Sequence, residues 1–273
     1  MTTSHPTRRA LVAGALSSLA APALAEGLPT RDIAFGPHPR QKLDIYLPSG
    51  PVSRAPVAFF IYGGSWSSGD KGTYGFVGDA FASRGFITVI ADYRLVPEVR
   101  FPSFIEDGAT ALATVRATIG RYGGDADRLH LIGHSAGAYN AMMLALDPRY
   151  LASAGVPRSA IRAAAGLSGP YDFLPLDVQA TRAAFGNARN PAETQPVNLV
   201  RRGAPRIFLG TGTADTTVLP RNTDALAARL QATGVPVTVR KYEGVGHAGT
   251  VLALAPLLRF TPVLDDVSRF FAG

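Results

Sequence analysis

The sequence contains the stretch Leu129-His130-Leu131-Ile132-Gly133-His134-Ser135-Ala136-Gly137. It is an apolar run that ends in the pattern Gly-x-Ser-x-Gly, and a helix-forming segment, 136–146, follows directly. In this pattern the glycines permit a sharp turn that leaves the serine hydroxyl exposed above a sheet. The pattern is short, so an ordinary glycine-rich turn is the alternative. The strand on one side and the helix on the other favour a nucleophile elbow with Ser135 at its tip.

Similar apolar runs recur along the chain, separated by segments with helical periodicity. Such runs suit strands buried on both faces, and their alternation with helices predicts an α/β fold with a mostly parallel sheet. Before them, segments 33–35 and 43–47 alternate apolar and polar residues, which predicts an amino-terminal antiparallel hairpin. The expected central strands are 57–62, 86–91, 129–133, 163–167, 207–210 and 237–242, and the clearest helices are 103–120, 136–146 and 224–233. Ser103 and Glu106 form the pattern of a capping box at the first of these helices.

The length of 273 residues suits one catalytic domain, expected over 26–273. The segment 170–203 is the least regular and is the expected insertion over a binding site. The formal charge of +7 raises the question of a nucleic-acid partner. However, the arginines are scattered singly apart from Arg201-Arg202, and a phosphate-tracking surface requires clustering, so we expect no nucleic-acid partner. Without cysteine, disulfides and thiolate metal sites are excluded.

The first 25 residues have the three parts of a secretory signal peptide. Arg8-Arg9 precedes an apolar stretch, 10–21, and the small-residue site Ala23-Leu24-Ala25 follows. The apolar stretch is shorter than the roughly 20 residues of a membrane-spanning helix, so we expect no stable membrane insertion after the signal is removed. The pair of arginines resembles a twin-arginine signal, although Leu11 takes the usual aromatic position. The sequence predicts an exported protein, periplasmic or secreted.

A serine nucleophile needs a base within hydrogen-bond reach. His247 is the best candidate among five histidines, because it follows the last expected strand in a glycine-rich loop at the carboxyl edge of the sheet. The third member should be a carboxylate that orients the imidazole, and Asp215 follows the strand at 207–210. Asp172 and Glu243 remain rivals for that role. The other histidines lie in the signal, in the hairpin, in a strand or beside the serine: His5, His38, His130 and His134.

Acyl transfer also requires N–H donors aimed at the developing oxyanion. The backbone amide of Ala136 is one candidate, and those of Gly64 and Ser65, in the loop after the first long strand, are the others. A tight turn without function is the alternative for this loop. From their adjacency to these positions, four residues are expected to contact the substrate: Tyr62, Gly63, Trp66 and His134.

Together these motifs resemble the α/β hydrolase superfamily, and more narrowly the carboxylesterases related to hormone-sensitive lipase and kynurenine formamidase. The narrower resemblance rests on five segments over about residues 30 to 270. It implies a mechanism without cofactor in which Ser135 is acylated by the ester and water activated by His247 releases the acid. The chain departs from the family at Tyr62, where a histidine is usual. The five segments are Tyr62-Gly63-Gly64-Ser65-Trp66, Gly69-Asp70-Lys71, Asp92-Tyr93-Arg94-Leu95, Phe101-Pro102 and Gly133-His134-Ser135-Ala136-Gly137.

Other functions have weaker support. Gly244-x-Gly246-x-x-Gly249 fits the dinucleotide fingerprint, but prolines interrupt the region where its helix and second strand would follow. No spacing of histidines or carboxylates suggests a metal site. An amidase or formamidase would use the same triad on another acyl substrate, and a catalytically silent ligand-binding hydrolase fold is a further alternative. The expected partner is a small-molecule ester, and the sequence predicts no oligomeric state.

Overall fold

A computed structural model describes residues 1–2, 28 and 30–273 of the chain. The expected signal peptide, 1–25, therefore lies outside the described residues apart from its first two. In the described part, no helix combines the length and the apolar character needed to cross a membrane.

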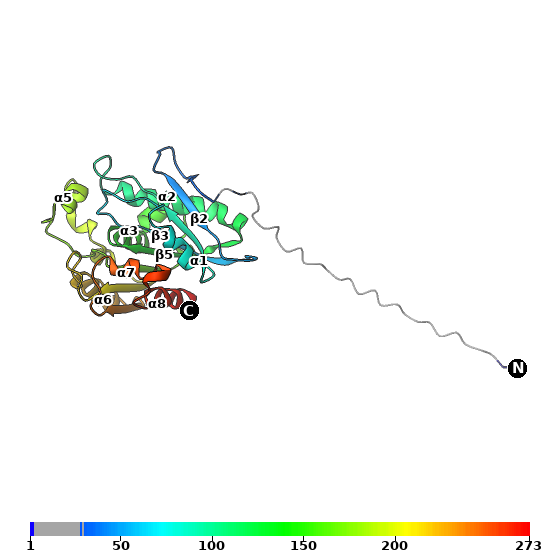
Figure 1. Ribbon diagram of the computed structural model, residues 1–273. Coiled ribbons are helices and arrows are strands. Elements are labelled where there is room, and N and C mark those ends of the chain that lie inside the picture. The colour runs from blue at the N-terminus through cyan, green and yellow to red at the C-terminus, as the bar shows by residue number, and fades with distance from the viewer. Residues whose placement is uncertain (3–27, 29) are drawn as a thin grey trace.

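The core of the molecule is one eight-stranded sheet with the strand order β1-β2-β4-β3-β5-β6-β7-β8 (Figure 1). β1 pairs antiparallel with β2, β2 pairs antiparallel with β4, and all other neighbours are parallel. The expected mostly parallel sheet with an amino-terminal antiparallel pair is thus confirmed. The strands are β1 (Ile33–Ala34), β2 (Lys42–Tyr46), β3 (Ala55–Ile61), β4 (Ile87–Ala91), β5 (Gly124–His134), β6 (Ile161–Leu167), β7 (Arg206–Gly212) and β8 (Val237–Tyr242).

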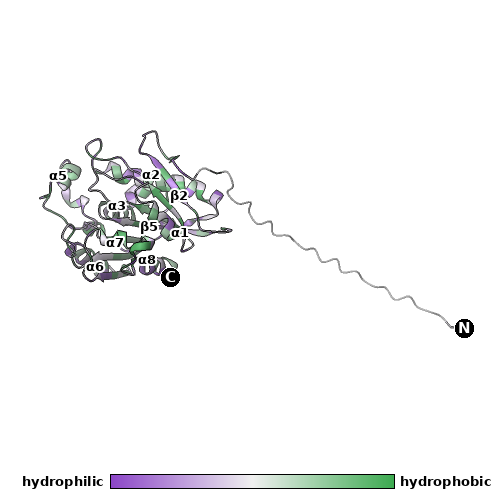
Figure 2. Cartoon of the chain, viewed as in Figure 1, coloured by the Kyte–Doolittle hydropathy of each residue, from purple (hydrophilic) through white to green (hydrophobic). Residues whose placement is uncertain are grey.

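Two groups of helices cover the sheet. α1 contacts α8 and β4, whereas α2, α3 and α4 contact one another, and α3 packs on β5 and β6. Figure 2 shows polar and apolar residues side by side along α5 and α6, as expected for helices with one face in solvent. The helices are α1 (Gly75–Ala82), α2 (Ser103–Thr118), α3 (Ala136–Leu146), α4 (Pro148–Ser153), α5 (Gln179–Phe185), α6 (Arg221–Thr233), α7 (Gly249–Leu252) and α8 (Val263–Ala272).

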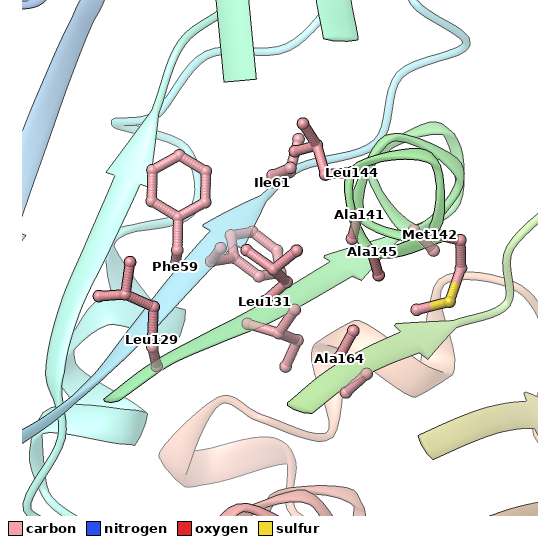
Figure 3. Packing of buried hydrophobic residues seen from close by; sticks show 14 of the residues in the cluster. Phe59, Ile61, Leu129, Leu131, Ala141, Met142, Leu144, Ala145 and Ala164 are labelled. Carbon is pink, nitrogen blue, oxygen red and sulfur yellow. The ribbon is translucent and has the colours of Figure 1, made fainter. Parts of the chain in front are cut away.

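The helix α3 is buried along its whole length, because its small residues let it lie close to the sheet. Figure 3 shows its side chains against residues of three strands. Full burial of one Leu or Met side chain contributes roughly 1.5–3 kcal/mol relative to exposure, so this layer fixes the position of the helix that follows Ser135. The residues labelled there are Phe59 and Ile61 of β3, Leu129 and Leu131 of β5, Ala164 of β6, and Ala141, Met142, Leu144 and Ala145 of α3.

Two local expectations were wrong. The capping box does not form, because Pro102 is the residue that precedes α2 and Ser103 lies inside the helix, where its side chain makes no capping hydrogen bond. β8 was expected to be buried on both faces, but it is an edge strand with only β7 beside it, and most of its residues are partly or fully exposed. An apolar run alone does not distinguish a central strand from an edge strand.

Candidate active site

Ser135 sits at the sharp turn between β5 and α3. Its backbone has φ 54° and ψ −125°, a conformation that L-residues rarely adopt, and its N–H donates to the Leu167 carbonyl at 2.9 Å. The flanking glycines are required sterically. A Cβ on Gly133 would lie 2.2 Å from the Gly137 carbonyl oxygen, and one on Gly137 would lie 2.0 Å from the Ile61 carbonyl oxygen. The pattern Gly-x-Ser-x-Gly therefore acts here as expected, by allowing a strained turn that presents the serine side chain.

Three side chains that are distant in the sequence meet at the carboxyl edge of the sheet. The Ser135 Oγ lies 2.8 Å from His247 Nε2, and His247 Nδ1 lies 2.8 Å from Asp215 Oδ2. A carboxylate can only accept a hydrogen bond, so Nδ1 carries a proton and Nε2 is free to accept from the serine hydroxyl. The His247 side chain is 18% exposed, and that of Asp215 is fully buried. This arrangement can remove a proton from Ser135 and hold the resulting imidazolium.

Asp215 is held rigidly in the loop after β7. Its Oδ1 accepts the backbone N–H groups of Thr217 at 3.0 Å and Val218 at 2.9 Å, which leaves Oδ2 for the imidazole. The two rival carboxylates, Asp172 and Glu243, are exposed to solvent. The structure therefore brings Asp215 to His247, as the sequence predicted.

The loop after β3 lies directly over the serine. A Cβ on Gly63 would be 2.9 Å from the Ser135 Cβ, so only glycine allows this approach. Gly64 and Ser65 follow with φ 123° and 53°, and the Gly64 carbonyl accepts the N–H groups of two later residues of the turn. Among the hydrogen bonds of the described residues, none uses the amide of Gly64, Ser65 or Ala136. These three N–H groups thus remain available to an oxyanion.

The side chain of Tyr62 lies in the core, whereas a substrate contact was expected there. Its ring is fully buried and stacks between Tyr74 and Tyr93, with centroid distances of 5.4 and 4.9 Å. Its hydroxyl donates to Asp92 Oδ1 at 2.7 Å and accepts from Arg40 Nη2 at 2.8 Å. The side chain points into the core because these polar partners lie there.

Arg40 and Asp92 brace the loop in a way that the sequence did not reveal. Arg40 Nη2 also donates to the Gly69 carbonyl at 2.6 Å, and Asp92 accepts the Lys71 amide at 2.7 Å. Burial raises the pKa of Asp92 and that of the Tyr62 hydroxyl, since both charged forms lose hydration. Asp92 belongs to one of the segments that carry the family resemblance, whereas nothing in the sequence marked Arg40.

Trp66 is also a core residue rather than a substrate contact. It is 3% exposed, and its Nε1 donates to Asn140 Oδ1 at 3.1 Å. Its ring meets Tyr139 and Phe185 edge to face, with centroid distances of 5.3 and 4.8 Å. Proximity in the sequence to the expected oxyanion loop was therefore a poor guide, because positive φ angles at Ser65 and Trp66 turn the indole inward.

His134 is buried and contacts the loop of His247, whereas a substrate contact was expected for it. It is 5% exposed, and its Nε2 donates to the His247 carbonyl at 3.0 Å, with the two rings 5.0 Å apart. Burial and the neighbouring His247 lower its pKa to about 4, so the ring is neutral near pH 7. It ties the loop that carries His247 to the end of β5.

Cofactor sites find little support in the geometry. The glycines Gly244, Gly246 and Gly249 form the loop around His247, and no strand follows β8 in the described part of the chain. The helix and second strand of a dinucleotide-binding unit are thus missing there. In the same part, no three His, Asp or Glu side chains group in a way that could hold a metal ion.

Comparisons with known proteins place this geometry among hydrolases. A family model described as BD-FAE matches residues 43–230. A probable isoprenylcysteine α-carbonyl methylesterase of Oryza sativa subsp. japonica is 30% identical over 248 residues, which cover 81% of this chain and 57% of the relative. The chain thus spans little more than half the length of that relative.

Two solved structures share the fold. A truncated carbohydrate esterase from gut microbiota is 19% identical, with a TM-score of 0.77 over 89% of this chain and 94% of that one. Thermogutta terrifontis esterase 2, phosphonylated by sarin, is 23% identical, with a TM-score of 0.73 over 85% of this chain and 89% of that one. At these identities the similarity shows the fold.

Proposed function

This chain belongs to the BD-FAE family of α/β hydrolases, and we propose that it is a serine hydrolase that cleaves small carboxylic esters through an acyl-enzyme. The observation that carries the proposal is the pair of 2.8 Å contacts that joins Ser135 to His247 and His247 to Asp215. The methylesterase and esterase names of its relatives and structural neighbours support an ester substrate. The Thermogutta esterase, described as phosphonylated by sarin, supports a mechanism with a nucleophilic side chain.

In the first half-reaction, His247 Nε2 takes the hydroxyl proton as Ser135 Oγ bonds to the ester carbonyl carbon. The negative charge that develops on the carbonyl oxygen is met by the free amides of Gly64, Ser65 and Ala136. Removal of one such donor costs about 10²–10³ in kcat in other hydrolases. When the tetrahedral intermediate collapses, the proton on His247 passes to the alkoxide, and the alcohol leaves.

In the second half-reaction, a water molecule loses a proton to His247 and attacks the acyl carbon. The same amides hold the second oxyanion, and the proton returns to Ser135 Oγ as the acid departs. Asp215 keeps the imidazole oriented throughout and stabilises the imidazolium without taking its proton. No group other than the side chains and amides described above is needed to balance these steps.

The test is hydrolysis of p-nitrophenyl acetate by the wild-type protein and by Ser135→Ala. We expect activity in the wild type and a loss of about 10³-fold or more in the variant. Ser153→Ala on α4 is a matched control, because it removes a hydroxyl that bonds only to the Tyr150 carbonyl. Equal activity of the wild type and Ser135→Ala would refute the mechanism.

The class of acyl substrate is tested separately. A panel of p-nitrophenyl esters from acetate to palmitate, with an anilide and a formamide, should show turnover of the short esters only. Turnover of the formamide above that of every ester would replace the esterase by a formamidase. No turnover of any of these, with no covalent labelling of Ser135, would instead indicate a ligand-binding protein.

We also propose that residues 1–25 direct export and are removed after Ala25. The support is the sequence alone: Arg8-Arg9, the apolar stretch and the small-residue site. Amino-terminal sequencing of the exported protein should begin at Glu26. Replacement of both arginines by lysine should block export by the twin-arginine route. Export of that variant at the wild-type level would refute this route.

A further inference from the structure

A cavity of about 750 Å³ lies at the opposite edge of the sheet from the triad. It is lined by Arg162 and Arg206, at the start of β6 and β7, and by Arg128 and His130 of β5, which lie beside the start of β6. Because these strands are parallel, their early residues share the amino edge, whereas Ser135 follows the end of β5. At about 3.3 Å per residue, His130 and Ser135 are roughly 16 Å apart along the chain. The cavity is therefore a separate place on the molecule.

All the charged side chains that line the cavity are arginines, set among mostly apolar residues. Six arginines face the cavity, and no Asp or Glu side chain does. Several arginines elsewhere pair with carboxylates, as Arg94 does with Asp107, whereas within the described residues none of the six belongs to an ion pair. The six are Arg128, Arg158, Arg162, Arg201, Arg202 and Arg206.

This cluster shows where much of the positive charge of the chain lies. The six arginines are scattered in the sequence, yet they gather in space, so much of the formal excess of +7 is concentrated at one site. A carboxylate on Gly273, which also lines the cavity, would offset only one of these charges. Asp147 influences Arg201 but is already bound by Arg149 at 2.8 Å. The scatter of arginines along the sequence, on which the expectation of no nucleic-acid partner was based, does not describe their distribution in space.

The guanidinium groups repel one another and remain charged. Burial and Arg158 lower the pKa of Arg201, and burial and Arg162 lower that of Arg206. An arginine is nevertheless always protonated near neutral pH. The folded protein therefore keeps these like charges close together, and a bound anion would reduce the repulsion among them.

Several of these side chains are held in place. Arg158 Nη2 donates to the Gly203 carbonyl at 2.7 Å, Arg201 Nε to the Leu146 carbonyl at 3.0 Å, and Arg206 Nη2 to the Phe271 carbonyl at 3.1 Å. Each of these contacts uses one nitrogen of the guanidinium and leaves others for a ligand. Arginines fixed in this way lose less freedom when they bind a ligand than free surface arginines would.

A buried polar atom at the cavity also favours a bound ligand. His130 lines the cavity, is 2% exposed and stacks on Phe271 with a centroid distance of 4.7 Å. Its Nδ1 has no hydrogen-bond partner among the described residues. A buried polar atom without a partner is costly, and a ligand hydroxyl or a protonated phosphate oxygen that donates to it would remove that cost.

We propose that this cavity binds a small ligand that carries two or more phosphate groups. The volume falls within the range of about 300–1,000 Å³ that small-molecule sites occupy. Guanidinium groups match phosphate oxygens with paired, charge-assisted hydrogen bonds. Several phosphates on one molecule use several of the six arginines, whereas a chloride ion would neutralise only one. The site is independent of the proposed hydrolysis.

The test is thermal unfolding and calorimetric titration of the protein with tripolyphosphate, against sodium chloride at equal ionic strength. At 100-fold excess over Kd, we expect the melting temperature to rise by about 5–10 °C with tripolyphosphate. Arg162→Glu combined with Arg202→Glu should lower the affinity at least tenfold, because both side chains are exposed and line the cavity. The same pair changed to Gln should give a smaller loss and guards against misfolding.

The matched control is Arg121→Glu with Arg229→Glu, which changes the net charge equally at two exposed arginines outside the cavity. It should bind tripolyphosphate as the wild type does, and hydrolysis of p-nitrophenyl acetate should be unchanged in all these variants. Equal stabilisation by chloride, or equal losses in the control, would overturn the proposal. A second result would also overturn it: binding to phosphatidylglycerol vesicles or single-stranded DNA that depends on Arg162 and Arg202, with no binding of tripolyphosphate. The ligand would then be a membrane surface or a nucleic acid rather than a small molecule.

Discussion

The two edges of the central sheet use polar side chains in opposite ways. At the carboxyl edge, Ser135, His247 and Asp215 form a chain of hydrogen bonds in which the charge of the carboxylate is met by the imidazole and by two amides. At the amino edge, six arginines face one cavity with no carboxylate among them. The first edge is organised by short, directional contacts, and the second by an excess of one charge.

The strand β5 connects these edges and carries a buried histidine near each. His134 is bonded to the loop of the proposed base, whereas His130 faces the arginine-lined cavity with a free Nδ1. Nδ1 of His134 also has no hydrogen-bond partner among the described residues, so the two edges differ in their balance of charge rather than in the hydrogen bonding of these two rings.

The largest expected effect concerns the carboxyl edge. His247→Ala should lower kcat/KM for p-nitrophenyl acetate by about 10³–10⁶, since Ser135 loses the base that activates it. The double variant Ser135→Ala, His247→Ala should lose little more than the more damaging single change, because the two residues act as one unit. Losses that multiply in the double variant would show that they act separately.

Asp215→Asn should have the next largest effect, a fall of about 10²–10⁴ in kcat with little change in KM. An amide cannot hold the imidazole in the required tautomer as a carboxylate does. Asp172→Asn is the control, because that side chain is exposed and should leave the rate unchanged. A loss of less than about threefold for Asp215→Asn would remove Asp215 from the triad.

Trp66→Ala should act mainly on stability. The loss of a buried indole is expected to lower the free energy of unfolding by about 3–5 kcal/mol, measured in urea. Trp66→Phe keeps part of the aromatic packing and should cost less. If Trp66→Ala changed the preference among esters while the free energy of unfolding stayed the same, the residue would belong to the substrate pocket after all.

Acid should destabilise the protein through the two buried histidines, and the effect of each one should be at the lower end of that expected for Trp66→Ala. Burial lowers the pKa of His134 to about 4 and, with nearby arginines, that of His130 to about 3, below the ordinary value of 6.5. The unfolded chain therefore binds protons that the folded chain does not. Stability should be full above pH 6.5 and fall as the pH drops towards 4, by on the order of 3 kcal/mol for each histidine.

Urea unfolding of the wild type and of His130→Phe at pH 8, 6 and 4.5 measures this effect. The variant should lose less stability between pH 8 and 4.5, because one of the two titrating groups is gone. Arg128, Arg162 and Arg206 face His130 and stay charged across this range, so they do not add their own titration. Identical pH dependence in the two proteins would contradict the assignment.

Much of the carboxyl edge could be predicted from the sequence, because backbone rules fix it. A strand, a glycine-flanked serine and a helix are local features, and the ends of parallel strands meet at one edge. Those rules predicted that Ser135, Asp215 and His247 lie at the same edge, where the structure brings their side chains within hydrogen-bond distance. They also predicted the central strands to within a few residues, although β5 begins at Gly124, earlier than its apolar run.

The directions of individual side chains and the arginine cluster depend on packing between distant segments, which local sequence rules do not predict. The direction of Tyr62 and Trp66 follows from buried partners on distant segments, Asp92 and Asn140. The arginine cluster arises only when β5, β6 and β7 lie side by side, so counting arginines along the sequence could not find it.

The most direct test of the proposed chemistry is labelling of the protein with a fluorophosphonate, followed by intact mass and peptide analysis. The result we predict is one adduct per chain, located on Ser135, that is absent in Ser135→Ala and forms far more slowly in His247→Ala. An adduct on another residue, or undiminished labelling of Ser135→Ala, would contradict the proposal that Ser135 is the nucleophile.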